Sequence, residues 1–348
     1  MKRIVMVAMA LILAFLLTAC GTKGPDVTAT QSPKATVPQE ADNAESGVVP
    51  TVTPKRALSY TTGLPFEGEY KPVMVIIENT PGVRPQTGLQ TADVVYELTV
   101  EGNITRFLCV YSDHVPEEVM PVRSARIPFL YIQNEWDSVL MHYGGAGSGP
   151  AERNDEYSFY GHKLYDEIKF DVDGWSGHWN KYFYRVSGIS APHNVMGNPL
   201  LAQALYNYNP EPLHWLFDSN AAYPGDGVSK IKLKMCTGDE DFISYTYDPK
   251  NDVYLRFMGD KPFKSAETGA QLTVKNVIVQ YSTFKVSETR KLWKMVGSGN
   301  ADIYIGGKLV KGSWERKSDN DRTVFYDDKG SEIVLRPGNT WIHIHPEE

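Results

Sequence analysis

Two arginines flank a serine in the segment 121–126 (Pro-Val-Arg-Ser-Ala-Arg). A helical pattern at 124–136 would place Ser124 at the helix N-cap, where its hydroxyl can accept a backbone N–H. Unbonded N–H groups at a helix N-terminus and the guanidinium groups of Arg123 and Arg126 attract the same kind of ligand, an anion such as phosphate, pyrophosphate or a carboxylate. The segment therefore predicts an anion site.

Two carboxylates could supply further chemistry beside these arginines. Glu97 and Glu101 lie on or next to a strand predicted at 94–100, and strand alternation places both on one face. Such a pair could act as general acid and base, or hold a divalent metal such as Mg²⁺. The alternative is that the two arginines only form salt bridges inside the protein, with Glu97, Glu101 or Asp93.

Among the histidines, His193 is the candidate for a catalytic role, because it lies in a loop sequence at 191–194 (Ala-Pro-His-Asn). Its neighbour Asn194 could bind the same ligand. His343 and His345 share one face of a predicted strand, and we expect a surface pair there, because a zinc site needs further ligands. The sequence predicts no bound metal, and Mg²⁺ enters only with an enzymatic alternative.

These residues must be positioned by a first half in which strands alternate with helices. Strands are expected at 72–78, 94–100, 105–111 and 139–143. Helices are expected at 124–136, 161–169 and 198–206. This mixture predicts an α/β-type domain, at 57–222, built on one mixed sheet.

The second half has a different pattern, with short alternating runs that end in turn residues. These runs lie at 228–236, 252–258, 271–281, 291–296, 301–305, 322–326, 331–335 and 340–345. Such spacing is typical of a small, mostly antiparallel all-β domain, a sandwich or barrel. We therefore predict an α+β protein whose second domain occupies 223–348.

The N-terminus predicts export and a lipid anchor. A basic start is followed by an uncharged apolar run at 4–17, which is shorter than the roughly 20 residues that a membrane-spanning helix needs. Small residues then precede Cys20, as lipoprotein signal peptidase requires. We expect a signal peptide at 1–19, a lipidated (palmitate-bearing) Cys20 and a disordered tether at 20–56, which place the protein on the extracytoplasmic face of the cell membrane.

Charge and cysteine content narrow the possible partners. The formal net charge is −7, and signal-peptide removal takes away Lys2 and Arg3 as well. An acidic chain is a poor match for nucleic acid, so no nucleic-acid partner is expected.

After Cys20, two cysteines remain, Cys109 and Cys236, each in an apolar run. They could form a disulfide, or they could be two buried free thiols.

The chain resembles the YerB-type lipoproteins, a bacterial family defined by a two-part domain of unknown function. The matching segments are 79–81 (Asn-Thr-Pro), 84–89 (Arg-Pro-Gln-Thr-Gly-Leu), 92–97 (Ala-Asp-Val-Val-Tyr-Glu), 101–107 (Glu-Gly-Asn-Ile-Thr-Arg-Phe), 121–126, 191–194, 275–279 (Lys-Asn-Val-Ile-Val), 296–299 (Val-Gly-Ser-Gly) and 337–342 (Pro-Gly-Asn-Thr-Trp-Ile). The resemblance supports the anchor and the two-part organisation. It implies no activity.

Two classes of function fit these features. The first is a cell-envelope binding protein for an anionic ligand, such as a cell-wall phosphate or a peptide carboxylate, or for a partner protein. The second is a cell-wall glycan enzyme, phosphotransferase- or hydrolase-like, with Glu97, Glu101 or His193 as catalytic groups. We favour binding, and the predicted ligand contacts are Arg84, Arg106, Arg123, Ser124, Arg126 and Asn194.

Overall fold

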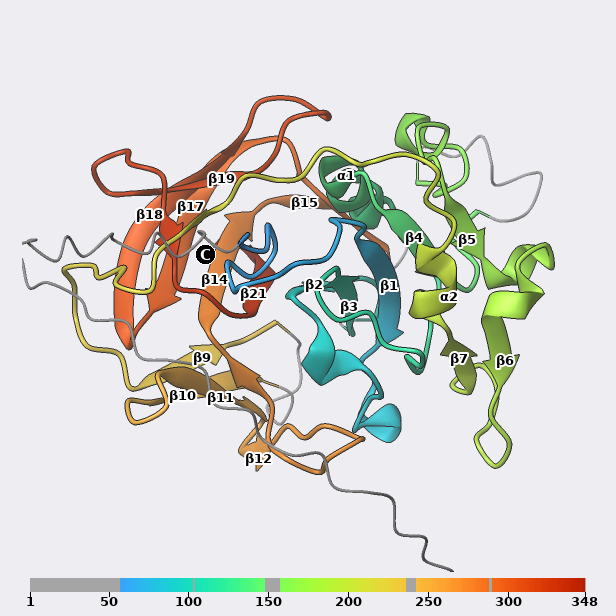
Figure 1. Cartoon of the computed structure of the whole chain (residues 1–348), viewed down its shortest axis with the longest axis horizontal. Coiled ribbons are helices and arrows are strands. Elements are labelled where there is room, and N and C mark those ends of the chain that lie inside the picture. Colours follow the sequence, from blue (N-terminus) through green and yellow to red (C-terminus); the bar gives the residue numbers. More distant parts are fainter. Residues whose placement is uncertain (1–56, 103, 148–156, 236–241, 288–289, 348) are drawn as a thin grey trace, which may run out of the picture. The chain divides into compact units, whose positions relative to one another are not determined.

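A ten-stranded mixed sheet joins strands from both halves of the chain (Figure 1). In sheet order its strands are β19 (Val324–Asp327), β18 (Lys308–Arg316), β17 (Gly297–Ile305), β14 (Asn276–Ser282), β21 (Thr340–Pro346), β2 (Val94–Thr99), β3 (Thr105–Tyr111), β1 (Val73–Glu78), β4 (Val139–His142) and β5 (Asp171–Asp173). The computed structural model describes residues 57–347 except 103, 148–156, 236–241 and 288–289. The predicted signal peptide, Cys20, the tether and Cys236 lie outside the described residues.

The last strand of the chain connects the two halves. β21 pairs in parallel with β14 on one side and with β2 on the other. Five strands of the second half therefore continue the sheet of the first half, instead of closing a sandwich or barrel of their own. The mixed sheet is confirmed, whereas the boundary between 57–222 and 223–348 stays a prediction.

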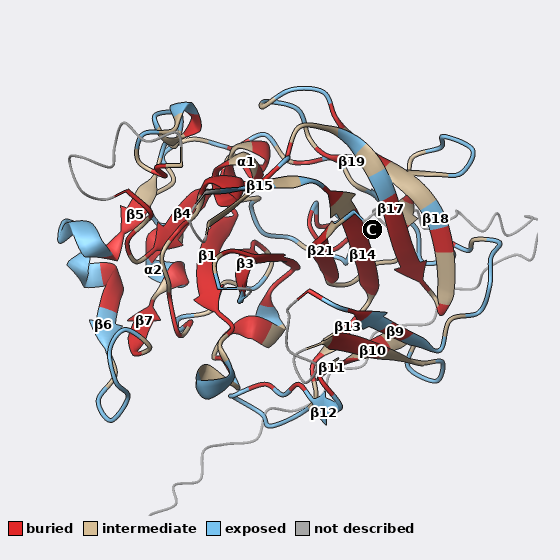
Figure 2. Ribbon diagram, turned by 180° about the vertical axis from the view of Figure 1, so that it is seen from behind, coloured by how far each residue is buried: buried red, intermediate tan, exposed pale blue. Residues whose placement is uncertain are grey.

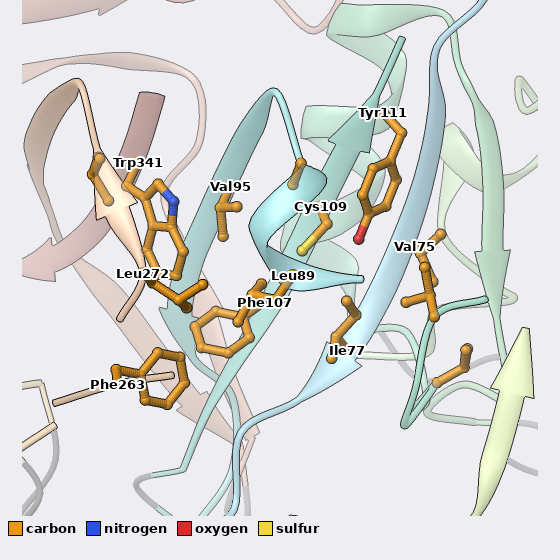
Figure 3. Packing of buried hydrophobic residues seen from close by; sticks show 14 of the residues in the cluster. Val75, Ile77, Leu89, Val95, Phe107, Cys109, Tyr111, Phe263, Leu272 and Trp341 are labelled. Carbon is orange, nitrogen blue, oxygen red and sulfur yellow. The ribbon is translucent and has the colours of Figure 1, made fainter. Parts of the chain in front are cut away.

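A smaller sheet covers one face of the large one. Its strands are β12 (Lys261–Pro262), β11 (Val253–Met258), β10 (Ile243–Asp248) and β9 (Lys230–Leu233), with β13 (Thr273–Val274) paired to β11. Figure 3 shows Phe263 and Leu272, from the region of this sheet, beside Phe107 and Trp341 of the large sheet. The rings of Phe107 and Trp341 lie 5.5 Å apart, edge to face. This layer contributes to the buried hydrophobic cluster on that side of the large sheet.

Helix α1 (Ile127–Trp136) covers the opposite face. Phe129, Leu130, Ile132 and Trp136 are buried there with alternate residues of β1, β2 and β3. Because both faces are covered, these central strands are buried along their whole length (Figure 2). This explains why their sequences are almost continuously apolar and not alternating.

The remaining described elements are short. They are α2 (Pro199–Gln203), the hairpin β15 (Phe284–Ser287) and β16 (Arg290–Trp293), the pairs β6 (Phe183–Arg185) with β7 (Val195–Gly197) and β8 (Leu216–Phe217) with β20 (Val334–Leu335), and 3-10 turns at Pro81–Val83, Leu89–Thr91, Lys163–Tyr165, Gly174–Ser176 and Asn180–Tyr182. No helix in the described part of the chain is long and apolar enough to cross a membrane.

Some predicted elements are wrong in extent. The helix predicted at 161–169 is only a 3-10 turn, because Leu164 N–H is taken by the ring of His162 and the hydroxyl of Tyr165 reaches Asp171 on β5. The helix predicted at 198–206 shortens to α2. β10 and β18 were not predicted, and β18 is rich in charged residues because much of it is only partly buried.

Two aspartates fix the first described residues to the large sheet. Asp93 accepts hydrogen bonds from the hydroxyl of Thr61 (2.9 Å) and from two backbone N–H groups, whereas Asp113 accepts from the hydroxyls of Ser59 (2.7 Å) and Thr62 (2.6 Å). Burial, followed by the charge of Asp113, raises the pKa of Asp93 to about 7. The folded protein therefore binds a proton at the Asp93 carboxyl group more tightly than the unfolded chain does.

We expect the Asp93→Asn substitution to remove a pH dependence of stability. Because the folded pKa of Asp93 is raised, its favourable contribution is fully present below the unfolded pKa and is lost as pH rises through about 7. The unfolding free energy of the wild type, relative to Asp93→Asn, should rise by about 2–3 kcal/mol from pH 8 to pH 5. Urea titrations measure it, with the exposed Asp328→Asn as control. If the difference in unfolding free energy between the wild type and Asp93→Asn does not change with pH, the raised pKa of Asp93 is contradicted.

Candidate functional site

The candidate site lies where β1 ends and β3 begins. Glu78, the last residue of β1, is directly opposite Arg106 of β3. The segment before α1 lies against this end of the sheet, because Glu78 N–H donates to Pro121 O (3.0 Å) and Arg123 N–H donates to Ile76 O (2.9 Å). These backbone bonds place the predicted anion-binding segment beside Glu78 and Arg106.

Three arginines converge there, and we call Arg106, Arg123 and Arg126 the arginine cluster. Arg126 Nε donates to Glu101 Oε2 (2.6 Å), and Arg106 Nη2 donates to Glu101 Oε1 (3.0 Å). Arg123 Nε lies 3.3 Å from Glu78 Oε2. The salt-bridge alternative is therefore correct for Glu101, and the sequence did not identify Glu78 as the partner of Arg123.

The arginine cluster carries more positive than negative charge. Its three guanidinium groups face two carboxylates, Glu78 and Glu101. Burial, followed by the positive charge of Arg126, lowers the pKa of Arg106 to about 9, although Glu101 opposes the effect. The guanidinium stays protonated at neutral pH, although burial and the neighbouring arginines disfavour its charge. A bound anion would favour that charge.

Glu78 also orients a histidine. His193 Nδ1 lies 2.9 Å from both carboxylate oxygens of Glu78, which is almost completely buried, and the hydroxyl of Thr80 donates to the same carboxylate (2.9 Å). The side chain of His193 is 38% exposed. A carboxylate at Nδ1 leaves Nε2 for a ligand or a proton. The structure therefore places His193 at the edge of the arginine cluster.

Glu97 belongs to a different network on the other face of the sheet. Its Oε2 accepts a hydrogen bond from Arg256 Nη2 (2.9 Å), and both side chains are fully buried. Its Oε1 accepts from Thr105 Oγ1 (2.7 Å) and Asn79 Nδ2 (3.2 Å). The prediction that Glu97 and Glu101 share one face is wrong, because β2 ends at Thr99 and Glu101 lies in the turn beyond it.

Arg84 is connected to the network of Glu97 through Asn79. Arg84 Nε donates to Asn79 Oδ1 (3.0 Å) and its Nη2 donates to Asn79 O (2.7 Å). Asn79 thus links Arg84 to the buried pair of Glu97 and Arg256. The predicted ligand contact of Arg84 stays a prediction.

Ser124 and Asn194 make hydrogen bonds beside the site, and their ligand contacts stay predictions. The N-cap of α1 is Arg126 without a side-chain cap, and the Ser124 hydroxyl donates instead to Tyr143 O (3.0 Å), so the capping prediction is wrong. Asn194 Oδ1 accepts from Arg185 Nη1 (2.7 Å) within the β6–β7 hairpin. Both residues support loops around the site.

The two C-terminal histidines are buried, so the predicted surface pair is wrong. His343 is fully buried, its Nε2 lies 2.8 Å from the Tyr245 hydroxyl, and burial followed by the charge of Arg256 holds its pKa well below the usual range. His345 is 9% exposed.

Among the described residues, no three His, Cys, Asp or Glu side chains are grouped as metal ligands. Cys109 is a buried free thiol, and burial raises its pKa.

Both halves of the chain match the two domains of one protein family. Residues 61–210 match the family described as protein of unknown function (DUF3048), N-terminal domain, and residues 231–342 match its C-terminal domain. The chain therefore has the two-part DUF3048 organisation. It belongs to the YerB family, as the sequence resemblance indicated.

One relative is known from both its sequence and a crystal structure. A Bacillus subtilis (strain 168) protein named as a lipoprotein, YerB, is 29% identical over 306 residues, which cover 85% of this chain and 88% of YerB. The crystal structure of YerB from Bacillus subtilis matches with a TM-score of 0.71 at 26% identity, covering 84% of this chain and 97% of that chain. The fold is therefore shared by both proteins.

We expect the buried Glu97–Arg256 pair to respond very differently to single and double substitution. Arg256→Met leaves Glu97 buried without its partner, which should lower the unfolding free energy by about 3–5 kcal/mol. The double variant Glu97→Leu/Arg256→Met leaves no buried charge and should be more stable than the single variant. Urea unfolding measures both.

The matched control is Arg322→Met. Its ion pair with Glu332 also has two hydrogen bonds (2.8 Å each), but both side chains are about a quarter exposed. Its loss should cost about 0–1 kcal/mol. An Arg256→Met variant as stable as this control would contradict the importance of the buried pair.

Proposed function

We propose that this protein is a lipid-anchored protein of the extracytoplasmic face of the cell membrane, and that it binds an anionic ligand of the cell envelope at the arginine cluster. The anchor rests on the sequence around Cys20 and on the similarity to a relative named as a lipoprotein. The uncompensated positive charge around Arg106 carries the binding proposal. Phosphate, pyrophosphate or carboxylate groups have the matching charge and oxygen geometry.

The pairing of the carboxylates favours binding over the enzymatic alternative. An acid/base or Mg²⁺ mechanism with Glu97 and Glu101 needs both side chains in one site. Glu97 is instead bonded to Arg256 and Glu101 to Arg126, in separate networks. An enzymatic role would have to rest on His193 and Glu78.

Substituting Arg123 should weaken anion binding without removing a structural ion pair completely. Arg123 is 20% exposed, and Glu78 keeps His193 as a partner after Arg123→Gln. Loss of a charge-assisted hydrogen bond of about 1.5–3 kcal/mol should weaken pyrophosphate binding roughly 10- to 100-fold. Isothermal titration of the full mature protein in detergent measures the dissociation constant.

Arg322→Gln provides the control, because Arg322 is comparably exposed and lies in another ion pair. It should leave the dissociation constant for pyrophosphate unchanged. Equal affinities of the wild type and Arg123→Gln, or no binding of pyrophosphate to the wild type, would contradict the proposed function.

A further inference from the structure

A groove adjoins the arginine cluster between α1 and the hairpin β15–β16. We call it the hairpin groove; it has a volume of about 390 Å³, and its walls include Tyr131, His162, Phe284, Lys285, Trp293 and Lys294. Ile127, which directly follows Arg126 of the cluster, also lines it. The two sites are therefore neighbours in space.

The hairpin is attached to the strand end that carries Glu101. Trp293 Nε1 donates to Thr99 O (2.8 Å), Lys291 N–H donates to Val100 O (3.0 Å), and Glu101 forms a β-bridge with Arg290. Glu101 in turn binds Arg106 and Arg126. The segment from Thr99 to Glu101 thus connects the hairpin groove, through Trp293, to the arginine cluster.

Aromatic rings form the sides of the hairpin groove. Tyr131 and His162 contact each other edge to face, with ring centroids 5.5 Å apart. Phe284 lies 4.8 Å from the ring of Trp293, which is nearly completely buried and supports it. Tyr131, His162 and Phe284 are half-buried, so part of each ring faces solvent. Partly exposed rings can pack against the apolar C–H faces of sugar rings.

The charge of the groove is positive. Lys285 and Lys294 are exposed, and neither makes an ion pair with a carboxylate in the described part of the chain. No Asp or Glu is among the described residues that line the groove. Aromatic walls with unpaired lysines suit a ligand that combines sugar rings with negative charge.

We infer that the hairpin groove and the arginine cluster form one extended site for a phosphate-bearing glycan. This inference rests on the proposed function and deepens it. A phosphate group binds at the arginine cluster, and the sugar rings next to it lie along Tyr131 and Phe284. Lys285 and Lys294 bind further negative charge on the same glycan.

Isothermal titration of the full mature protein in detergent tests the inference with three probes: inorganic phosphate, neutral chitotetraose and chitotetraose 1-phosphate. The wild type should bind chitotetraose 1-phosphate at least tenfold more tightly than either other probe. Phe284→Ala and, separately, Lys285→Ala/Lys294→Ala should each reduce this advantage severalfold and leave phosphate affinity unchanged. The control Lys250→Ala/Lys329→Ala removes two exposed lysines elsewhere and should change nothing.

The outcomes separate the two proposals. If phosphate binds but chitotetraose 1-phosphate has no advantage, or the groove variants keep the full advantage, the groove inference is wrong and the arginine cluster stands. If chitotetraose binds as tightly as chitotetraose 1-phosphate, the inference is also wrong, because the phosphate group would then contribute nothing to affinity. If neither phosphate nor the sugar phosphate binds, the proposed function is wrong as well.

Discussion

The structure depends on the cost of burying the charge of Arg256. Its guanidinium lies between the two sheets, fully shielded from water, 4.2 Å from the ring centre of Trp341 and bonded to Glu97 and Tyr245. Such a charge is tolerated only with its partner in place, so the small sheet cannot leave the large one without exposing or separating the pair. Because Arg256 comes from β11 and Glu97 from β2, this one contact couples the second half of the chain to the first.

The same constraint organises the end of the sheet where the candidate site lies. Strand alternation at the end of β1 directs Glu78 to the α1 face, among the arginine cluster, and Asn79 to the face of the small sheet, against Glu97. On the face of the small sheet, the buried carboxylate of Glu97 is paired with the buried guanidinium of Arg256. The other face gathers three guanidinium groups around two carboxylates, with Arg106 buried and its pKa lowered. The difference between the two faces is what makes one of them structural and the other a candidate for ligand binding.

Sequence patterns predicted local structure well and long-range partners poorly. The apolar runs of β1, β2 and β3 and the grouping of Arg123 and Arg126 were evident, because each is set by nearby residues. Glu78 was missed as a site residue because it ends a buried strand and its partners come from distant loops. Arg256 could not be paired with Glu97 across 159 positions without the fold. The turn after β2 also breaks the period-two alternation, and so Glu101 could not be placed by extending the strand pattern.

The position at which a tetrahedral dianion binds is the most direct test of anion binding at the arginine cluster. Crystals of the full mature protein soaked in tungstate would give an anomalous signal from tungsten that identifies the position of the anion. We predict a peak within hydrogen-bonding reach of Arg106, Arg123 or Arg126, where β1 ends and β3 begins, and a weaker peak in Arg123→Gln crystals. Well-occupied tungstate elsewhere on the protein, with none at these three guanidinium groups, would contradict it.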